Sequence, residues 1–396
     1  RENLRRGDEA VMSTLRIAMI GQKGIPARFG GVETHVDHIA TRLAARGHEM
    51  WTFCRTRFRP DRLGGEAPDG YRVIGGEHWY RGVRLVYRPS VDTKHLDAAS
   101  HTLLCALESG MFHRFDIVHF HGIGPSAFVP VTKMFGRKVV STFHALDWRQ
   151  VKWGRMAKSF LKHGEASGAR RSDGIITVSK IMKRYVRDTY GLEAQYIPNG
   201  ATLPESPPVK GEIARYGLSG GDYVLTVGRI IRDRGLHHLI DAFKGLPGDK
   251  RLVIVGSETP KTPYTDELRA MADGRVVFTG DVFGRALEDL YANCSVYALA
   301  SKVEGLPITV CEAMAHGRPL LLSEIPENRE VAGDAAVYFK PSDVNGLRAA
   351  LQALIEDRGL QSELSSRGVE RARSTYNWER IAEQVEAFYY KVLGSK

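Results

Sequence analysis

Short apolar segments alternate with amphipathic segments from residue 15 nearly to the end of the chain. In the first half, strands are expected at 15–20, 50–54, 84–87, 117–120, 138–143 and 174–178. Apolar positions at helical spacing predict a helix over 32–46, which Gly47 closes. Strands separated by helices of this length predict a parallel sheet with helices on both faces.

The alternation restarts after a proline-rich stretch, residues 203–211, which is the expected linker. Further strands are expected at 223–227, 252–255, 276–278, 295–298 and 319–323, helices at 236–244 and 309–316, and a last helix with one apolar stripe near 377–393.

A chain of 396 residues exceeds the usual size of a single core. We therefore predict two doubly wound α/β domains, residues 14–200 and 201–376, that face each other across a cleft, and we expect residues 1–13 to be a flexible extension. Sheets of this kind bind ligands beyond the carboxyl ends of their strands, so the cleft is the expected site.

The formal net charge of +10 indicates an anionic partner, which by charge alone is a phosphate, a membrane surface or a nucleic acid. The sequence contains no recognised nucleic-acid-binding module, so we expect no nucleic acid. The four cysteines form no C-x-x-C pair, which argues against a zinc site or a disulfide framework and fits a cytoplasmic protein. No two aspartates are spaced D-x-D, so we do not expect a divalent metal ion held by such a pair to neutralise a diphosphate. We also expect no cofactor.

The most informative motif is the segment 301–317, SKVEGLPITVCEAMAHG. Glu304 is expected in a loop after a strand, and Glu312 in the first turn of the following helix. Thr309 and Val310 would offer free N–H groups at that helix start, which favours an anion. Two carboxylates beside such a site suit a ligand with hydroxyls around a phosphate. The alternative is that Glu312 complements the helix dipole and Glu304 is merely solvated.

Two arginines, Arg229 and Arg234, follow the first expected strand of the second domain. Five residues apart across a strand-to-helix turn, they would clamp a diphosphate. The alternative is two exposed surface arginines.

The glycine pair Gly30-Gly31 opens the helix after the first strand, where backbone can approach a ligand closely. The segment is not G-x-G-x-x-G, which disfavours a nicotinamide dinucleotide. His121 is expected just past the end of its strand, and His144 follows the neighbouring strand. We expect both histidines at the same edge of the sheet, although lone histidines are more often structural.

Seven lysines and arginines but a single acid occur over 148–171, with Trp148, Trp153 and Phe160 interleaved. This pattern is typical of a cationic amphipathic helix that rests on an anionic membrane. The alternative is a solvated helix whose aromatic side chains pack on its own domain.

Together these residues resemble glycosyltransferase family 4, retaining enzymes with two Rossmann-like domains in the GT-B fold. The segment from Glu304 to Gly317 is similar to the family's E-x7-E motif with A-M-A-x-G, and Arg229 to its Gly-Arg arginine. Arg234 stands where a lysine is usual, and Pro307 where many members have a second glycine. The segments 23–31 and 144–148 resemble a bacterial subgroup associated with rhamnosyl and other surface-polysaccharide transferases.

The resemblance implies metal-independent, retaining transfer of a sugar from a nucleotide-diphosphate sugar, foremost a UDP-sugar, to a hydroxyl of a glycan or lipid-linked acceptor. It also implies that the last helix, 377–396, returns to the first domain. The residues implied to be catalytic are His121, Arg229, Arg234 and Glu304. Donor binding is implied for Gly30, Gly31, Val282, Gly305, Leu306, Ile308, Thr309, Val310 and Glu312, and acceptor binding for Glu33, His35, His144, Asp147 and Trp148.

Three other hypotheses remain open on the same residues. A nucleotide-sugar 2-epimerase would convert the donor without an acceptor, and a phosphorylase would carry a lysine-bound pyridoxal phosphate. A non-catalytic nucleotide-sugar-binding protein would bind the donor and leave it intact. For the leading hypothesis we expect a cytoplasmic enzyme that rests on the inner face of the plasma membrane.

Overall fold

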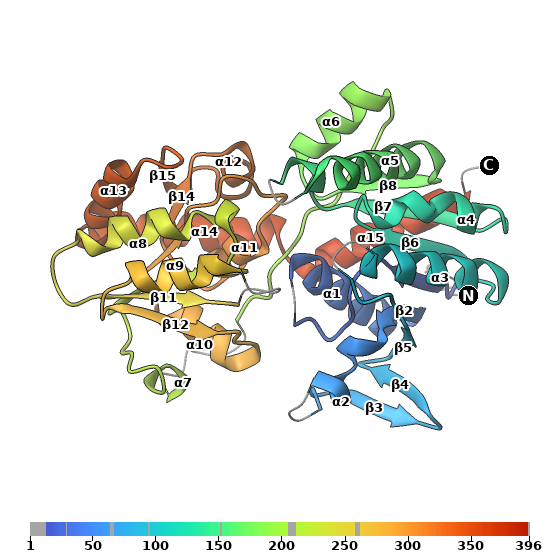
Figure 1. The fold of residues 1–396 in the computed structure, drawn as a ribbon, viewed down its shortest axis with the longest axis horizontal. Coiled ribbons are helices and arrows are strands. Elements are labelled where there is room, and N and C mark those ends of the chain that lie inside the picture. Colours follow the sequence, from blue (N-terminus) through green and yellow to red (C-terminus); the bar gives the residue numbers. More distant parts are fainter. Residues whose placement is uncertain are drawn as a thin grey trace, which may run out of the picture.

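The computed structural model describes residues 13–28, 30–63, 67–93, 96–150, 153–204, 211–257 and 262–394. It has two α/β lobes side by side, the N-terminal lobe on the right of Figure 1 and the C-terminal lobe on the left. Residues 1–12 of the expected extension and 205–210 of the expected linker lie outside the described residues. Among the helices that are described, none combines the length and apolar character needed to span a bilayer.

The N-terminal lobe is built on a nine-stranded sheet in the order β3-β4-β5-β2-β1-β6-β7-β8-β9. Its strands are β1 (Arg16–Ile20), β2 (Glu49–Arg55), β3 (Tyr71–Ile74), β4 (Glu77–Tyr80), β5 (Val83–Arg88), β6 (Ile117–His121), β7 (Lys138–Phe143), β8 (Gly174–Thr177) and β9 (Gln195–Tyr196). All neighbours pair in parallel except β3 with β4 and β4 with β5, an antiparallel edge that the sequence analysis did not anticipate.

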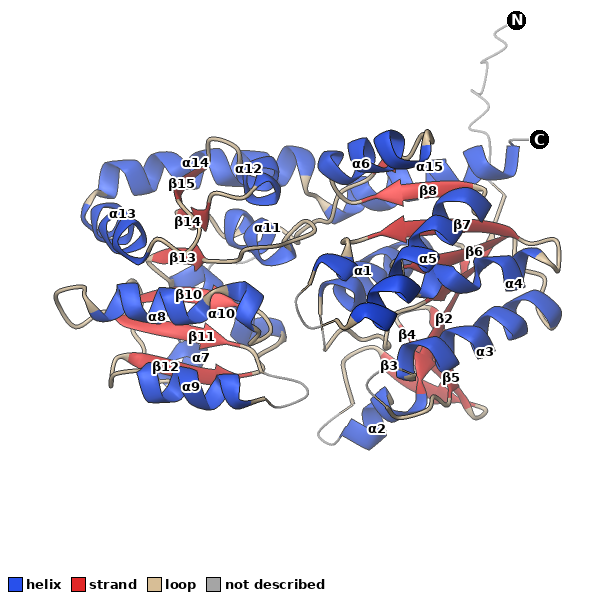
Figure 2. Cartoon of the chain, turned by 45° about the horizontal axis from the view of Figure 1, so that its top comes forward, coloured by secondary structure: helices blue, strands red, loops and turns tan. Residues whose placement is uncertain are grey.

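Helices cover both faces of this sheet (Figure 2). They are α1 (Gly31–Ala45), α2 (Pro60–Leu63), α3 (Asp97–Met111), α4 (Val129–Lys133), α5 (Arg155–Arg171) and α6 (Lys180–Tyr190), with the short 3-10 turns η1 (Thr56–Phe58), η2 (Pro125–Phe128) and η3 (Asp147–Arg149). The predicted basic helix over 148–171 therefore begins only at Arg155, after a separate turn at 147–149.

The C-terminal lobe contains a fully parallel six-stranded sheet in the order β12-β11-β10-β13-β14-β15. Its strands are β10 (Tyr223–Val227), β11 (Arg251–Val255), β12 (Val276–Gly280), β13 (Val296–Leu299), β14 (Leu320–Ser323) and β15 (Ala336–Phe339). The helices are α7 (Gly211–Ala214), α8 (Leu236–Lys244), α9 (Pro263–Met271), α10 (Gly284–Asn293), α11 (Ile308–Ala315), α12 (Pro326–Ala332), α13 (Val344–Glu356) and α14 (Arg358–Thr375), with the 3-10 turn η4 (Arg232–Arg234).

The last helix, α15 (Trp378–Gly394), crosses back to the N-terminal lobe and packs beside α1, as expected (Figure 1). Its buried stripe, which includes Trp378, Ile381 and Val385, joins the same core as α1 and β1. Glu386 anchors it to the loop after α1, because its carboxylate accepts hydrogen bonds from Arg46 at 2.6 Å and from His48 at 2.9 Å. The prediction of two doubly wound lobes with a returning helix is confirmed.

Strand order reverses between β1 and β6 in one sheet and between β10 and β13 in the other. Loops that leave adjacent strands in opposite directions open a crevice at the carboxyl edge of a parallel sheet. Each lobe therefore places two loops at such a crevice, and the candidate residues lie on these loops.

Candidate functional site

A cleft of about 350 Å³ lies where the two crevices face each other. From the N-terminal lobe it is lined by the loop after β1, the start of α1 and the loop after β7. From the C-terminal lobe it is lined by the loops after β10, β12 and β13 and by the start of α11. The predicted residues that line it are Gly30, Gly31, His144, Asp147, Arg229, Arg234, Val282, Glu304, Gly305, Leu306, Ile308, Thr309 and Glu312.

The two arginines after β10 are held differently. The Arg234 guanidinium donates to the Val227 carbonyl at 3.2 Å, and its Nε lies 3.6 Å from Glu304 Oε1. Gly228 makes room for it, since a Cβ there would lie 2.6 Å from Arg234 Nη1 and the glycine has φ +141°. Arg229 is exposed to the cleft and forms no ion pair with any described residue. One cation is thus fixed by the backbone, and the other is available to a ligand.

Glu312 reaches the cleft from the second turn of α11 rather than from the first turn, as the spacing had suggested. Its carboxylate accepts a hydrogen bond from the Tyr291 hydroxyl at 2.7 Å. Burial raises the pKa of Glu312 to about 7. The carboxylate is therefore held in one orientation and ionises only near neutral pH.

The expectation that Val310 offers a free N–H was wrong. Its N–H donates to the Pro307 carbonyl at 3.1 Å, and its side chain is fully buried in the core of the C-terminal lobe. This bond closes the first turn of α11, because Pro307 is the residue that precedes the helix. Thr309 and Ile308 do line the cleft.

Glycines allow the lobes to touch at the cleft. A Cβ on Gly305 would lie 1.9 Å from the His144 carbonyl oxygen, so the backbones of the two lobes are in contact there. A Cβ on Gly31 would lie 3.6 Å from Ile308 Cδ1, another contact between the lobes. A side chain at position 305 would force the lobes apart, so the close contact between the lobes requires glycine at this position.

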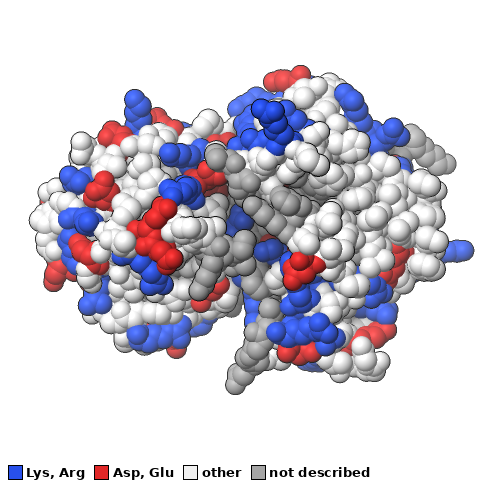
Figure 3. Space-filling model, in the orientation of Figure 1, with Lys and Arg blue, Asp and Glu red and all other residues white. Residues whose placement is uncertain are grey.

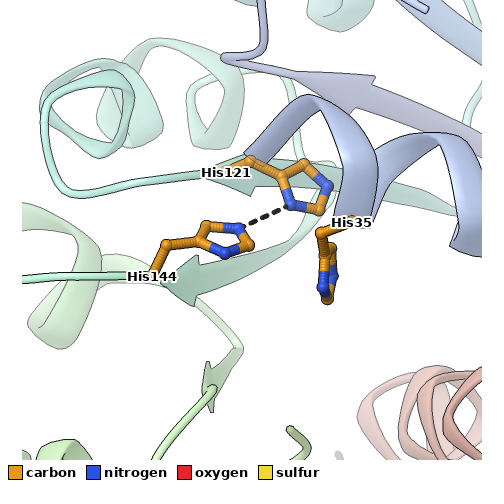
Figure 4. Close-up of side chains that lie close together, drawn as sticks. All are labelled: His35, His121 and His144. Atoms are coloured by element: carbon orange, nitrogen blue, oxygen red, sulfur yellow. Dashed lines mark hydrogen bonds between the residues drawn. The ribbon is translucent and has the colours of Figure 1, made fainter. Parts of the chain in front are cut away.

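Three histidines meet beneath the cleft, and of the three only His144 lines it (Figure 4). His35 comes from α1, His121 from the end of β6 and His144 from the loop after β7. His121 is the last residue of its strand and only 1% exposed, so it lies beneath the cleft floor, not past the strand end as expected. Burial lowers the pKa of all three, that of His35 to about 4, so the imidazoles are neutral at physiological pH.

Three predicted acceptor residues, Glu33, His35 and Trp148, are not among the residues that line the cleft, and His35 is fully buried. The Trp148 indole N–H donates to Glu165 on α5 at 2.7 Å, and the ring packs against the core beneath that helix. Glu33 is buried and accepts a hydrogen bond from the Lys23 backbone N–H at 2.9 Å. Trp148 is therefore turned away from the cleft, whereas Glu33 fixes the loop that follows β1.

Two residues that organise the site, Asn199 and Tyr291, were not assigned a role from the sequence. The Asn199 amide accepts a hydrogen bond from His35 Nδ1 at 3.0 Å and donates to the Leu306 carbonyl at 2.9 Å, so it joins the two lobes. Tyr291 orients Glu312. The turn 198–200, Pro-Asn-Gly, was a signal for Asn199, but the partner of Glu312 lies on another helix and left no local signal.

Basic residues gather on α6 as well as on α5. Figure 3 shows lysine and arginine side chains over α6, at the top of the N-terminal lobe. A shallow basic pocket there is lined by Lys180, Lys183, Arg184, Arg187 and Tyr196. On α5, Met156 is 89% exposed and Phe160 is 39% exposed, whereas Leu161 is buried.

Comparisons with known proteins agree in both halves of the chain. The model of Glycosyltransferase Family 4 matches residues 29–203, and that of Glycosyl transferases group 1 matches residues 221–357. Glycogen synthase of Mycobacterium tuberculosis is 27% identical, over 95% of this chain and 94% of its own length. Phosphatidyl-myo-inositol mannosyltransferase of Mycolicibacterium smegmatis is also 27% identical, over 92% of this chain and 91% of its own length. The Anabaena protein HepE, solved with UDP and glucose, superposes with a TM-score of 0.75 at 16% identity, covering 95% of this chain and 100% of HepE.

Proposed function

Since this chain is a glycosyltransferase of the family 4 type with the GT-B fold, we propose that it moves a sugar from a nucleotide-diphosphate sugar to an acceptor hydroxyl. The reaction proceeds with retention of the anomeric configuration and without a metal ion. The observation that carries this proposal is the convergence of Arg229, Arg234, Glu304 and Glu312 on one cleft, opposite Gly30 and His144 of the other lobe.

The chemistry of the donor half fits a nucleoside diphosphate. The guanidinium groups of Arg229 and Arg234 neutralise the diphosphate as it leaves, and electrostatic stabilisation of this kind is usually the largest catalytic contribution. The Glu312 carboxylate accepts the hydrogen bonds of a ribose diol, and Glu304 those of sugar hydroxyls. A UDP-sugar is the proposed donor, which is supported by the UDP bound in the similarly folded HepE.

The neutral histidines favour attack on the same face as the leaving group. An imidazole whose pKa lies near 4, as at His35, is neutral at physiological pH and does not act as a general acid there. His144, which lines the cleft, holds a sugar hydroxyl by a hydrogen bond, and His121 supports the His144 ring from beneath. The departing phosphate oxygen takes the proton of the acceptor hydroxyl. No protein nucleophile is required, and closure of the lobes keeps water from the reactive sugar.

The N-terminal side of the cleft offers polar side chains to an acceptor, among them those of Arg28, His144 and Asp147. We propose a glycan or lipid-linked acceptor in bacterial surface-polysaccharide or glycoconjugate synthesis, within the rhamnosyltransferase-like subgroup. The basic helices α5 and α6 and the exposed Met156 would hold the enzyme at an anionic membrane beside such an acceptor. The lipid-modifying mannosyltransferase among the relatives supports this choice.

A thermal-shift panel with UDP, GDP and dTDP tests the donor site, because a ligand that binds the folded state raises the melting temperature. UDP should give the largest shift, and Arg229→Ala should weaken UDP binding on the order of 10- to 100-fold, as expected for loss of a charged hydrogen bond. Arg232→Ala is the matched control, since Arg232 lies in the same loop but pairs with Glu267. Equal UDP affinity in both variants would refute the site.

Product analysis tests the reaction itself. With a hydroxyl acceptor and UDP-sugar, NMR should show that the product keeps the anomeric configuration of the donor, and the rate should not fall in EDTA. Conversion of the donor without an acceptor would instead identify an epimerase, and binding without turnover would identify a sensor.

A further inference from the structure

The histidine cluster beneath the cleft has a geometry that sugar binding does not require. One ring nitrogen from each of His35, His121 and His144 can be chosen so that the three atoms all lie within 4.8 Å of one another. Figure 4 shows the three rings gathered around a common space, contributed by α1, β6 and the loop after β7. The three residues are separated in sequence by 86 and 23 positions, so the fold alone assembles them.

The tautomer of His35 is set by its neighbour. Asn199 donates through Nδ2 to the Leu306 carbonyl at 2.9 Å, which leaves its Oδ1 as the atom that faces His35 Nδ1 at 3.0 Å. His35 Nδ1 therefore carries the hydrogen, and Nε2 carries a lone pair. That Nε2 is buried and has no hydrogen-bond partner among the described residues. A buried acceptor without a donor is unfavourable unless something binds it.

The other two histidines complete the donor set. His121 Nδ1 and His144 Nε2 lie 3.3 Å apart. Two imidazole nitrogens bound to one tetrahedral Zn²⁺ at about 2.0–2.1 Å are separated by roughly 3.3 Å, so this pair already has the spacing of metal ligands. The remaining nitrogen of His121 faces the thioether of Met19 at 3.0 Å.

We propose that His35, His121 and His144 form a binding site for a divalent transition metal of borderline softness, Zn²⁺ in the first place. Neutral imidazole is the form that binds such a metal, and His35 Nε2 is buried without a hydrogen-bond partner among the described residues. Asn199 serves as the outer partner that a metal-bound histidine usually has. Three protein ligands leave a fourth position open, and it is reached from the cleft that His144 lines.

The metal would act as an inhibitor, not as a cofactor. The site lies on the N-terminal side of the cleft, apart from the arginines that face the diphosphate, so it does not replace their role. A bound ion would occupy His144, which the proposed function assigns to the sugar. Zn²⁺ should therefore lower the transfer rate in competition with the donor, a consequence that rests on the proposed function.

Metal binding itself is tested without any turnover. The full chain, stripped with EDTA and freed of chelator, is titrated with CoCl₂. One equivalent should bind with the intense visible absorption of four-coordinate Co²⁺, and ZnCl₂ should abolish that absorption. His35→Gln and His144→Gln should lose it, and Asn199→Ala should bind on the order of 10- to 100-fold more weakly. His163→Gln, an exposed histidine on α5, is the matched control and should bind like the wild type.

An X-ray absorption spectrum of the wild-type chain with one equivalent of Zn²⁺ needs no variant, so it decides the matter even if a substitution prevents folding. Three imidazole nitrogens at about 2.0 Å are expected. A six-coordinate Co²⁺ spectrum, or equal binding by His35→Gln and the wild type, would overturn the site. If the site binds Zn²⁺ and transfer is undiminished, the inhibition is refuted. An absence of transfer with intact Co²⁺ binding would count against the proposed function alone.

Discussion

Replacing Glu312 by Gln should stabilise the protein while it weakens nucleotide binding. Burial raises the pKa of this carboxyl from 4.5 to about 7, so the fold disfavours the ionised form. The glutamine keeps an oxygen that can accept the hydrogen bond of the Tyr291 hydroxyl. The glutamine thus resembles the protonated form of Glu312 and avoids the cost of burying a negative charge.

The size of the effect follows from the two pKa values. The difference is about 2.5, and each pKa unit corresponds to about 1.4 kcal/mol, so the ionised carboxylate costs the folded state at most roughly 3 kcal/mol. Glu312 is partly open to the cleft, and solvent screening reduces this to about 1–2 kcal/mol. A carboxyl whose pKa is raised by folding destabilises the folded state above that pKa and has almost no effect on stability below its unfolded pKa. The free energy of unfolding therefore falls as the pH rises from 4.5 to 7, and above pH 7 this carboxyl adds no further pH dependence.

Thermal unfolding at several pH values measures this prediction. At pH 8 the Glu312→Gln variant should melt roughly 2–8 °C above the wild type, as expected for a lobe of this size. At pH 5 the difference should shrink to about a quarter. Glu370→Gln, an exposed position on α14, is the matched control and should give no pH-dependent difference.

Isothermal titration calorimetry with UDP tests the predicted effect of this substitution on nucleotide binding. The wild-type affinity should rise between pH 6 and pH 8, because the ribose diol donates to the ionised carboxylate, and the variant should bind more weakly with no such rise. A variant that is less stable than the wild type at pH 8, or a difference independent of pH, would refute the assigned cost of ionisation. A UDP affinity equal to that of the wild type would refute the ribose contact.

Two glycine substitutions test how the cleft is assembled. Gly305→Ala would place a Cβ 1.9 Å from the His144 carbonyl oxygen, so steady-state kinetics should show kcat/KM lowered on the order of 100-fold by displacement of the lobes, and wild-type rates would contradict the contact. Gly228→Ala would place a Cβ 2.6 Å from the Arg234 guanidinium and should weaken UDP binding about tenfold. Gly221→Ala, also at positive φ but with nothing within 4 Å, should destabilise the chain with unchanged UDP affinity.

The architecture could be predicted because alternation of short apolar runs with amphipathic helices is a property of local sequence. The expected helix 236–244 coincides with α8, and the last helix differs from α15 by one residue at each end. The β3–β4 hairpin was missed because the segment 71–80 is half exposed and has no continuous apolar run. Continuous apolar runs in the sequence predict strands well where helices cover both faces of the sheet, and poorly at an exposed edge.

The site could be predicted only as far as its residues lie on one loop or helix. The Glu304–Glu312 segment and the arginines after β10 were found in this way. Trp148 was assigned to the acceptor because the resemblance of segment 144–148 implied it. In the turn η3, however, Asp147 lines the cleft whereas the Trp148 indole donates to Glu165 on α5. Contacts such as His35 with Asn199 join residues 164 positions apart, and no local pattern reports them.

The placement of glycines shows why the two lobes must work together. Gly31 and Gly305 lie where one lobe meets the other, and Gly228 lies where a guanidinium rests on the backbone. Each lobe offers only half of the ligand groups, because each sheet opens one crevice at its switch point. A diphosphate bound by the C-terminal lobe alone would leave its sugar in water. Under the proposed function, the close backbone contact at Gly305 would bring His144 toward the sugar and exclude water that would otherwise compete with the acceptor.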